Sequence, residues 1–113
     1  MIVLENPINI SELKSLGAEY YPDMIKAVAD VASGRLAFCA EMHSDLERLL
    51  LASGSGQENL WGFNIYPDAD EDDFIEFDSL INIRPRQKNF SRDVENPEIR
   101  EKIKALVKSS VER

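Results

Sequence analysis

Residues 60–84 read LWGFNIYPDADEDDFIEFDSLINIR, and segments 61–66 and 74–84 within them alternate apolar and polar side chains. A period of two is typical of a strand with one buried face, and the acidic segment 67–73 fits a connecting loop. The second strand should run from Phe74 to Arg84, because Pro85 lacks the N–H that a ladder needs. The stretch therefore predicts a β-hairpin with one long strand.

The hairpin register follows from keeping the apolar side chains on one face. Pairing Tyr66 with Phe74 places Asn64 opposite Glu76. The face predicted to be buried then carries seven apolar side chains: Trp61, Phe63, Ile65, Ile75, Phe77, Ile81 and Ile83.

An earlier hairpin is predicted from segments 24–31 and 36–42, which also alternate. A turn at Ser33-Gly34 would pair Val31 with Leu36 and Ile25 with Met42. The competing interpretation is a helix over residues 24–32, because alanine is frequent there.

Three amphipathic helices are predicted from their caps. The first runs over residues 10–16 after Asn9, the second begins at Ser44, and Asn96-Pro97 opens the third. Two hairpins and three helices predict an α+β fold, an antiparallel sheet with three helices packed on one face. The chain's length fits a single domain of residues 1–113.

The composition limits the function classes. A net charge of −8 weighs against general nucleic-acid binding, which depends on Lys and Arg. We expect the basic segment 84–92 to pair with the acidic segment 67–73 within the chain. Cys39, the single cysteine, cannot form an internal disulfide, and no apolar run approaches the roughly 20 residues of a membrane span. The expected location is the cytoplasm, with no membrane partner.

The polar face of the long strand is the first candidate site. Alternate residues share a face of a strand, so Glu76, Asp78, Asn82 and Arg84 would form a row. The predicted binding residues are Asn64, Glu76, Asp78, Asn82, Arg84 and Arg92. A solvated sheet face must also be polar, so the row alone does not require a function.

A second candidate lies at the end of the first hairpin, where Cys39, Glu41 and His43 are spaced two apart. All three residue types can bind zinc. His43 is the only histidine, so an imidazole acid–base role would fall to it, with Glu41 to orient it. The candidate metal ligands are Glu41, His43, Glu76 and Asp78. A buried cysteine and a locally bonded histidine are the structural alternatives.

Three segments resemble a family of short, uncharacterised prokaryotic proteins, a domain of unknown function: Glu41-Met42-His43-Ser44-Asp45, residues 54–67 and residues 75–85. The resemblance continues through residues 89–100. Its polar positions match Glu41, His43, Asn64, Glu76, Asp78, Ser79, Asn82, Arg84, Asn89 and Arg92. Cys39 has no match, which argues against that residue as a ligand. The resemblance implies a bacterial or archaeal source and does not indicate which activity the protein has.

Two functional hypotheses remain open. The first is a binding module that uses the polar sheet face toward a protein partner or a second copy. It is motivated by Phe74 and Leu80, two apolar residues predicted on that face. The second is a small metal-assisted hydrolase with a Glu/His/Asp site, in which Arg84 or Arg92 would steady an anionic substrate. No organic cofactor is expected, and a divalent cation is the one candidate.

Overall fold

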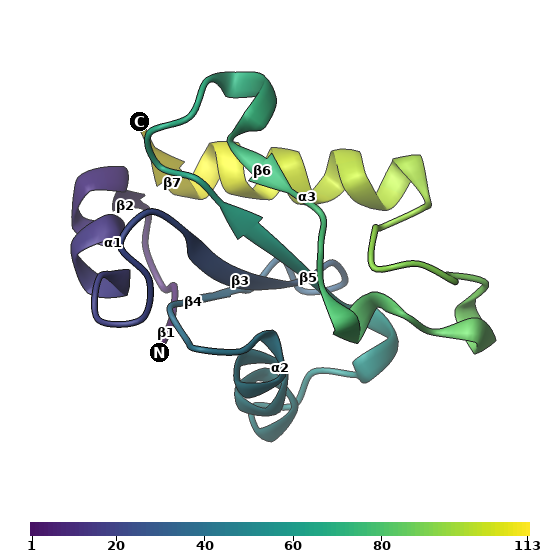
Figure 1. The fold of residues 1–113 in the computed structure, drawn as a ribbon. Coiled ribbons are helices and arrows are strands. Elements are labelled where there is room, and N and C mark those ends of the chain that lie inside the picture. The colour runs from purple at the N-terminus through teal and green to yellow at the C-terminus, as the bar shows by residue number, and fades with distance from the viewer.

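The computed structural model describes residues 1–113 and has a five-stranded antiparallel sheet at its centre (Figure 1). In spatial order the strands are β1 (Ile2–Val3), β4 (Leu36–Phe38), β3 (Ile25–Asp30), β5 (Leu60–Ile65) and β6 (Ile75–Glu76). A separate parallel pair joins β2 (Ile8–Asn9) to β7 (Val111–Glu112). The predicted α+β class and antiparallel sheet are confirmed, and residues 25–30 form a strand and not the alternative helix.

The three α-helices are α1 (Ile10–Gly17), α2 (His43–Ala52) and α3 (Pro97–Ser110). The side chains of Asn9 and Asn96 accept hydrogen bonds from the first backbone N–H groups of α1 and α3, as predicted. Helix α2 differs, because it begins at His43 after Met42 and has no side-chain cap. Four short 3₁₀ turns complete the chain: η1 (Gln57–Asn59), η2 (Glu71–Asp73), η3 (Leu80–Asn82) and η4 (Pro85–Gln87). No helix has both the length and the apolar character needed to cross a membrane.

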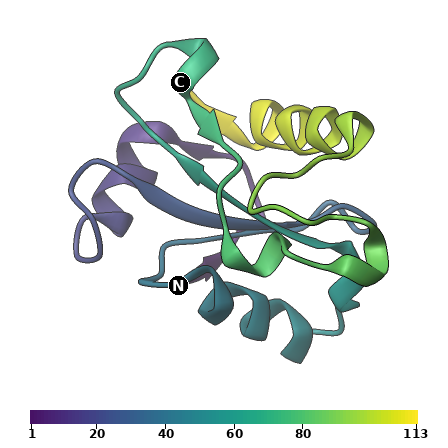
Figure 2. The ribbon, with the colours of Figure 1, turned by 45° about the vertical axis from the view of Figure 1, so that its right-hand side comes forward.

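The helices cover both faces of the sheet, so their predicted packing on one face is not confirmed. The larger core lies under α1 and α3 and includes Leu13, Phe38, Phe63 and Ile103. The smaller core lies under α2 on the other face and consists of Val28, Ala37, Ala40, Leu46, Leu50 and Leu60. Figures 1 and 2 both show α3 and α2 on opposite sides of the sheet. We call the two sides the α3 face and the α2 face.

The first hairpin is shifted by two residues from its predicted register, because its loop is longer. Ala29 pairs with Leu36, where Val31 was expected. The Asp30 carboxylate accepts from the backbone N–H groups of Ala32 and Ser33, at 2.9 and 3.0 Å. These bonds form a turn directly after Asp30, so the loop begins two residues earlier than predicted. The shift by two keeps the same faces, but β4 ends at Phe38 and Met42 is exposed instead of buried.

The second hairpin has the predicted register, with Asn64 opposite Glu76 and Ile65 opposite Ile75. Its second strand is much shorter than predicted, because β6 ends at Glu76. Beyond that point the backbone of β5 is paired by a side chain: Asn82 Oδ1 accepts from Gly62 N–H at 2.8 Å, and Asn82 Nδ2 donates to the Gly62 carbonyl at 2.9 Å. One buried amide thus replaces the missing strand.

The chain leaves the sheet after Glu76, so several residues predicted to lie in the core take other positions. Phe77 still reaches the larger core, with its ring centroid 6.4 Å from that of Phe63. Ile81 packs instead against the smaller core, and Ile83 is exposed. Phe74, predicted on the polar face, is buried in the larger core.

Candidate functional site: a polar cluster beside helix α2

Strand pairing places Lys26, Asn64 and Glu76 side by side on the α2 face, because β3, β5 and β6 are adjacent. Helix α2 packs over the apolar part of that face, around Val28 and Leu60. The part that carries Glu76 remains exposed. With the neighbouring side chains, these residues form what we call the polar cluster: Lys26, His43, Asn64, Tyr66, Glu76, Asp78 and Arg92.

The two carboxylates of the polar cluster are held by hydrogen bonds. Glu76 Oε1 accepts from Asn64 Nδ2 at 2.9 Å and from the Tyr66 hydroxyl at 2.8 Å. Asp78 Oδ1 accepts from Arg92 Nε at 2.6 Å in an ion pair. Burial and the bond to Glu76 raise the pKa of Tyr66 to about 12, so the phenol keeps the proton that it donates. The second oxygen of each carboxylate makes no hydrogen bond within the chain.

His43 is buried at the start of α2, and its Nε2 lies 2.9 Å from the Phe63 carbonyl oxygen. A carbonyl only accepts, so Nε2 carries the proton and Nδ1 presents a lone pair. Burial lowers the pKa of His43, and the Lys26 ammonium lowers it further, whereas the Phe63 carbonyl, Asn64 and Asp78 favour the charged ring. The ring is therefore neutral at pH 7.

Asn64 Oδ1 is buried and has no hydrogen-bond partner. The Asn64 side chain raises the pKa of the His43 ring, although no hydrogen bond joins the two side chains. An unpaired buried acceptor costs about 1–3 kcal/mol.

The buried His43 predicts a loss of stability in mildly acidic solution. Its folded-state pKa lies below the ordinary value of 6.5, so the unfolded chain takes up the proton first. The stability that depends on a neutral His43 ring is complete above pH 6.5 and decreases as the pH falls toward the folded-state pKa of this histidine. Urea midpoints measured across this window should fall in the wild type and stay nearly level in His43→Gln. Ordinary carboxylates titrate only near pH 4 and so do not contribute in this window. Urea midpoints that fall equally with pH in both proteins would therefore contradict a buried, neutral His43.

The row of four polar residues predicted on the long strand is not formed. Only Glu76 and Asp78 belong to the polar cluster. Asn82 is fully buried, where it bonds to Gly62 and to the Arg92 carbonyl. Arg84 lies over the Trp61 ring and donates to the Leu60 carbonyl, at the opposite end of β5 from Asn64.

The predicted Cys39, Glu41 and His43 group is also separated. Cys39 has a left-handed backbone (φ 71°), which ends the strand alternation, and its thiol is buried near Leu13 on the α3 face. Burial raises the pKa of this thiol, which disfavours the thiolate that binds metals. Glu41 is exposed, and its backbone carbonyl accepts from Tyr21. No group of three or more His, Cys, Asp and Glu side chains is placed to hold a metal ion.

Apart from Glu41, which is exposed, the polar residues matched to the predicted family pattern fall into two groups in the structure. His43, Asn64, Glu76, Asp78 and Arg92 meet in the polar cluster. Ser79, Asn82, Arg84 and Asn89 instead hold segment 77–95 onto the sheet. The Asn89 amide, for example, donates to the carbonyls of Asn82 and Asp93 at 2.8 and 2.7 Å.

The predicted pairing of the basic segment 84–92 with the acidic segment 67–73 is wrong, because no ion pair joins them. The acidic segment pairs instead with Lys14 of α1 through Asp68. A cavity of about 590 Å³ lies on the α3 face, between η2 and the last turns of α3. It shares no residue with the polar cluster, and no sequence motif indicated it.

The fold and the polar cluster define a small α+β domain with an ordered, partly exposed set of charged side chains. Residues 2–110 match the family described as "Protein of unknown function (DUF5674)", and the chain belongs to this family. The predicted resemblance to an uncharacterised family is thereby confirmed. No curated protein and no solved structure matches the chain. The function is unknown.

Proposed function

We propose that the protein is a small binding module that contacts a protein partner through the polar cluster. The observation that carries this proposal is the exposed Glu76, whose carboxylate two donors hold in place through one oxygen while the second oxygen makes no hydrogen bond within the chain. Groups fixed before binding lose little conformational entropy on association, so they are suited to recognition.

The polar cluster carries charges of both signs. Glu76 and Asp78 are acidic, and Lys26 and Arg92 are basic, all on one side of the sheet. A two-fold interface brings the same patch of two molecules together, so the patch must be complementary to itself. A second copy of the chain is the partner that we propose for this surface.

Exposed apolar side chains flank the polar cluster along the chain. Leu80 is 64% exposed and follows Asp78 by two residues, and Met42 is 54% exposed and precedes His43. Exposed apolar side chains beside organised polar groups are typical of protein interfaces. Phe74, which the sequence predicted on this face, contributes nothing to the surface because it is buried.

The test is sedimentation velocity over a range of concentrations, with Leu80→Lys as the variant. Removing an interface anchor and adding a charge should weaken self-association about tenfold or more, the effect of a residue worth at least about 1.4 kcal/mol. Leu16→Lys, an exposed position on α1 that is 43% accessible, is the matched control and should associate like the wild type. Equal weakening by both variants, or a wild type that stays monomeric at high concentration, would refute a homodimer through this surface.

The alternative function, a metal-assisted hydrolase, would need Glu41, His43, Glu76 and Asp78 to converge on one cation. No three such side chains do so, and no observation favours this function over the binding module. For the location we keep the cytoplasm as our proposal, because the single cysteine is a free thiol.

A further inference from the structure

We propose that the cavity on the α3 face is a binding site for a small zwitterion with an apolar body, such as a short apolar peptide. The cavity measures about 590 Å³, within the range of roughly 300–1,000 Å³ that is usual for small-molecule sites. It lies on the face of the sheet opposite the polar cluster, so this second site is independent of the proposed self-association.

Part of the cavity lining is apolar. Phe74, Val107 and Val111 line it and also belong to the larger core, so their positions are fixed by packing. Arg113 closes one side, with its guanidinium 4.1 Å from the centroid of the Phe74 ring and a 2.7 Å bond to the Ala69 carbonyl. A rigid apolar surface favours a ligand with an aliphatic or aromatic body.

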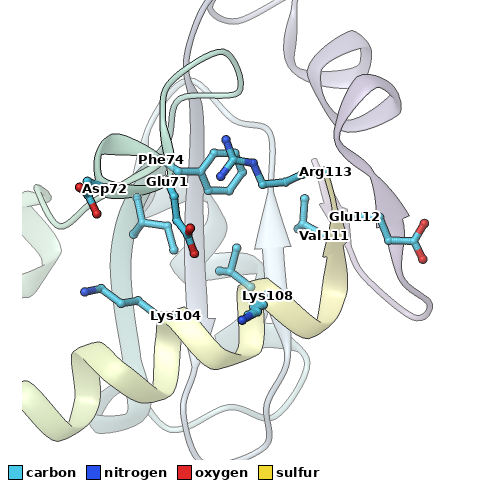
Figure 3. Close-up of a pocket in the computed structure, with 10 residues that line it drawn as sticks. Glu71, Asp72, Phe74, Lys104, Lys108, Val111, Glu112 and Arg113 are labelled. Carbon is cyan, nitrogen blue, oxygen red and sulfur yellow. The ribbon is translucent and has the colours of Figure 1, made fainter.

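Opposite walls of the cavity carry opposite charges. Glu71 comes from the acidic turn η2, whereas Lys104 and Lys108 lie one turn apart on α3 (Figure 3). Figure 3 shows the Glu71 side chain directed toward α3 across the opening, while Glu112 points away from it.

These charges are not paired with each other. Lys104 lies 3.6 Å from Glu101 on its own helix, and neither Glu71 nor Lys108 forms an ion pair. An unpaired carboxylate and an unpaired ammonium on opposite walls are complementary to a ligand that carries both charges. Its ammonium would bind Glu71, its carboxylate would bind Lys108, and its side chains would cover Val107 and Val111.

Dileucine is a suitable probe, and its two blocked derivatives separate the two charges. N-acetyl-dileucine lacks the ammonium, and dileucine amide lacks the carboxylate. Titrations followed by amide chemical shifts should move the signals of Phe74, Val107 and Val111, while those of Asn64 and Glu76 stay in place. Each blocked derivative should bind about two- to fivefold more weakly than dileucine, the effect of losing one exposed ion pair.

Two variants assign the contacts. Glu71→Gln should weaken the binding of dileucine by about two- to fivefold and leave the binding of N-acetyl-dileucine unchanged. Lys108→Gln should weaken the binding of dileucine by the same factor and leave the binding of dileucine amide unchanged. Glu98→Gln, at the other end of α3, is the control and should change neither. No shift at the cavity residues would overturn the proposal. Blocked derivatives that bind as tightly as dileucine, or variants that weaken all three ligands equally, would also overturn it. Each variant's thermal midpoint verifies that it is folded.

Discussion

Asn82→Ala should destabilise the fold by about 2–5 kcal/mol, the largest effect that we expect from one polar side chain. The substitution removes three hydrogen bonds and leaves the N–H and carbonyl of Gly62 without partners inside the protein. Denaturant midpoints measure the loss. Arg86→Ala, at an exposed position in the same segment, is the control and should stay within about 0.5 kcal/mol of the wild type.

Asn82→Asp sharpens this test because it keeps the shape of the side chain. The introduced carboxyl can accept from Gly62 N–H, but when ionised it cannot donate to the Gly62 carbonyl. The variant should regain part of its stability as the pH falls, because the protonated carboxyl can donate again. A cost below about 1 kcal/mol for Asn82→Ala would show that Asn82 does not replace a strand.

Gly62→Ala should cost about 1–3 kcal/mol, the usual range for overpacking. A Cβ at this position would lie 2.7 Å from Ser79 Cβ and 3.1 Å from Ile81 Cγ1, so segment 79–81 must move away from β5. The free energy of unfolding, taken from denaturant curves, gives the cost.

Ser79→Gly provides the matched background for this substitution. It removes the two nearest atoms that the new methyl group would meet, Ser79 Oγ and Cβ, and leaves only the contact with Ile81. Gly62→Ala should therefore cost much less in that background than in the wild type. Equal costs in both backgrounds would place the strain elsewhere.

The sequence was sufficient to predict the second hairpin, because alternation on both strands permits only one register that buries Phe63 with Phe77. It was not sufficient for the length of the second strand. Residues 77–84 also alternate, but the buried Asn82 amide pairs with Gly62 in place of a strand backbone. A side chain that substitutes for a backbone leaves no periodic signal.

The sequence indicates that the α2 face is also buried, although the predicted packing of all helices on one face did not take this into account. Val28 lies between Ala27 and Ala29, and such an uninterrupted apolar run is typical of a strand buried on both faces. The shift of the first hairpin depends on Asp30, whose carboxylate lengthens the loop through local bonds that alternation cannot reveal.

The polar cluster was predicted in part. Asn64, Glu76 and Asp78 follow from the strand register, and His43 and Arg92 came only as members of the candidate set. His43 reaches the polar cluster because of where α2 begins, and Arg92 reaches it because segment 77–95 folds back onto the sheet. Both are tertiary features. Asn82 and Arg84 are polar for a different reason. Asn82 bonds to the backbone of β5, and Arg84 bonds to the Ile81 carbonyl within that segment.

Amide chemical shifts recorded during dilution of the protein test most directly whether the polar cluster is a binding surface. If two copies associate through this surface, the signals of Asn64, Glu76, Asp78 and Leu80 should move together with concentration. Those of α1 and of the cavity residues Val107 and Val111 should remain in place. Shifts confined to other surfaces, or no shift at any concentration, would contradict the claim.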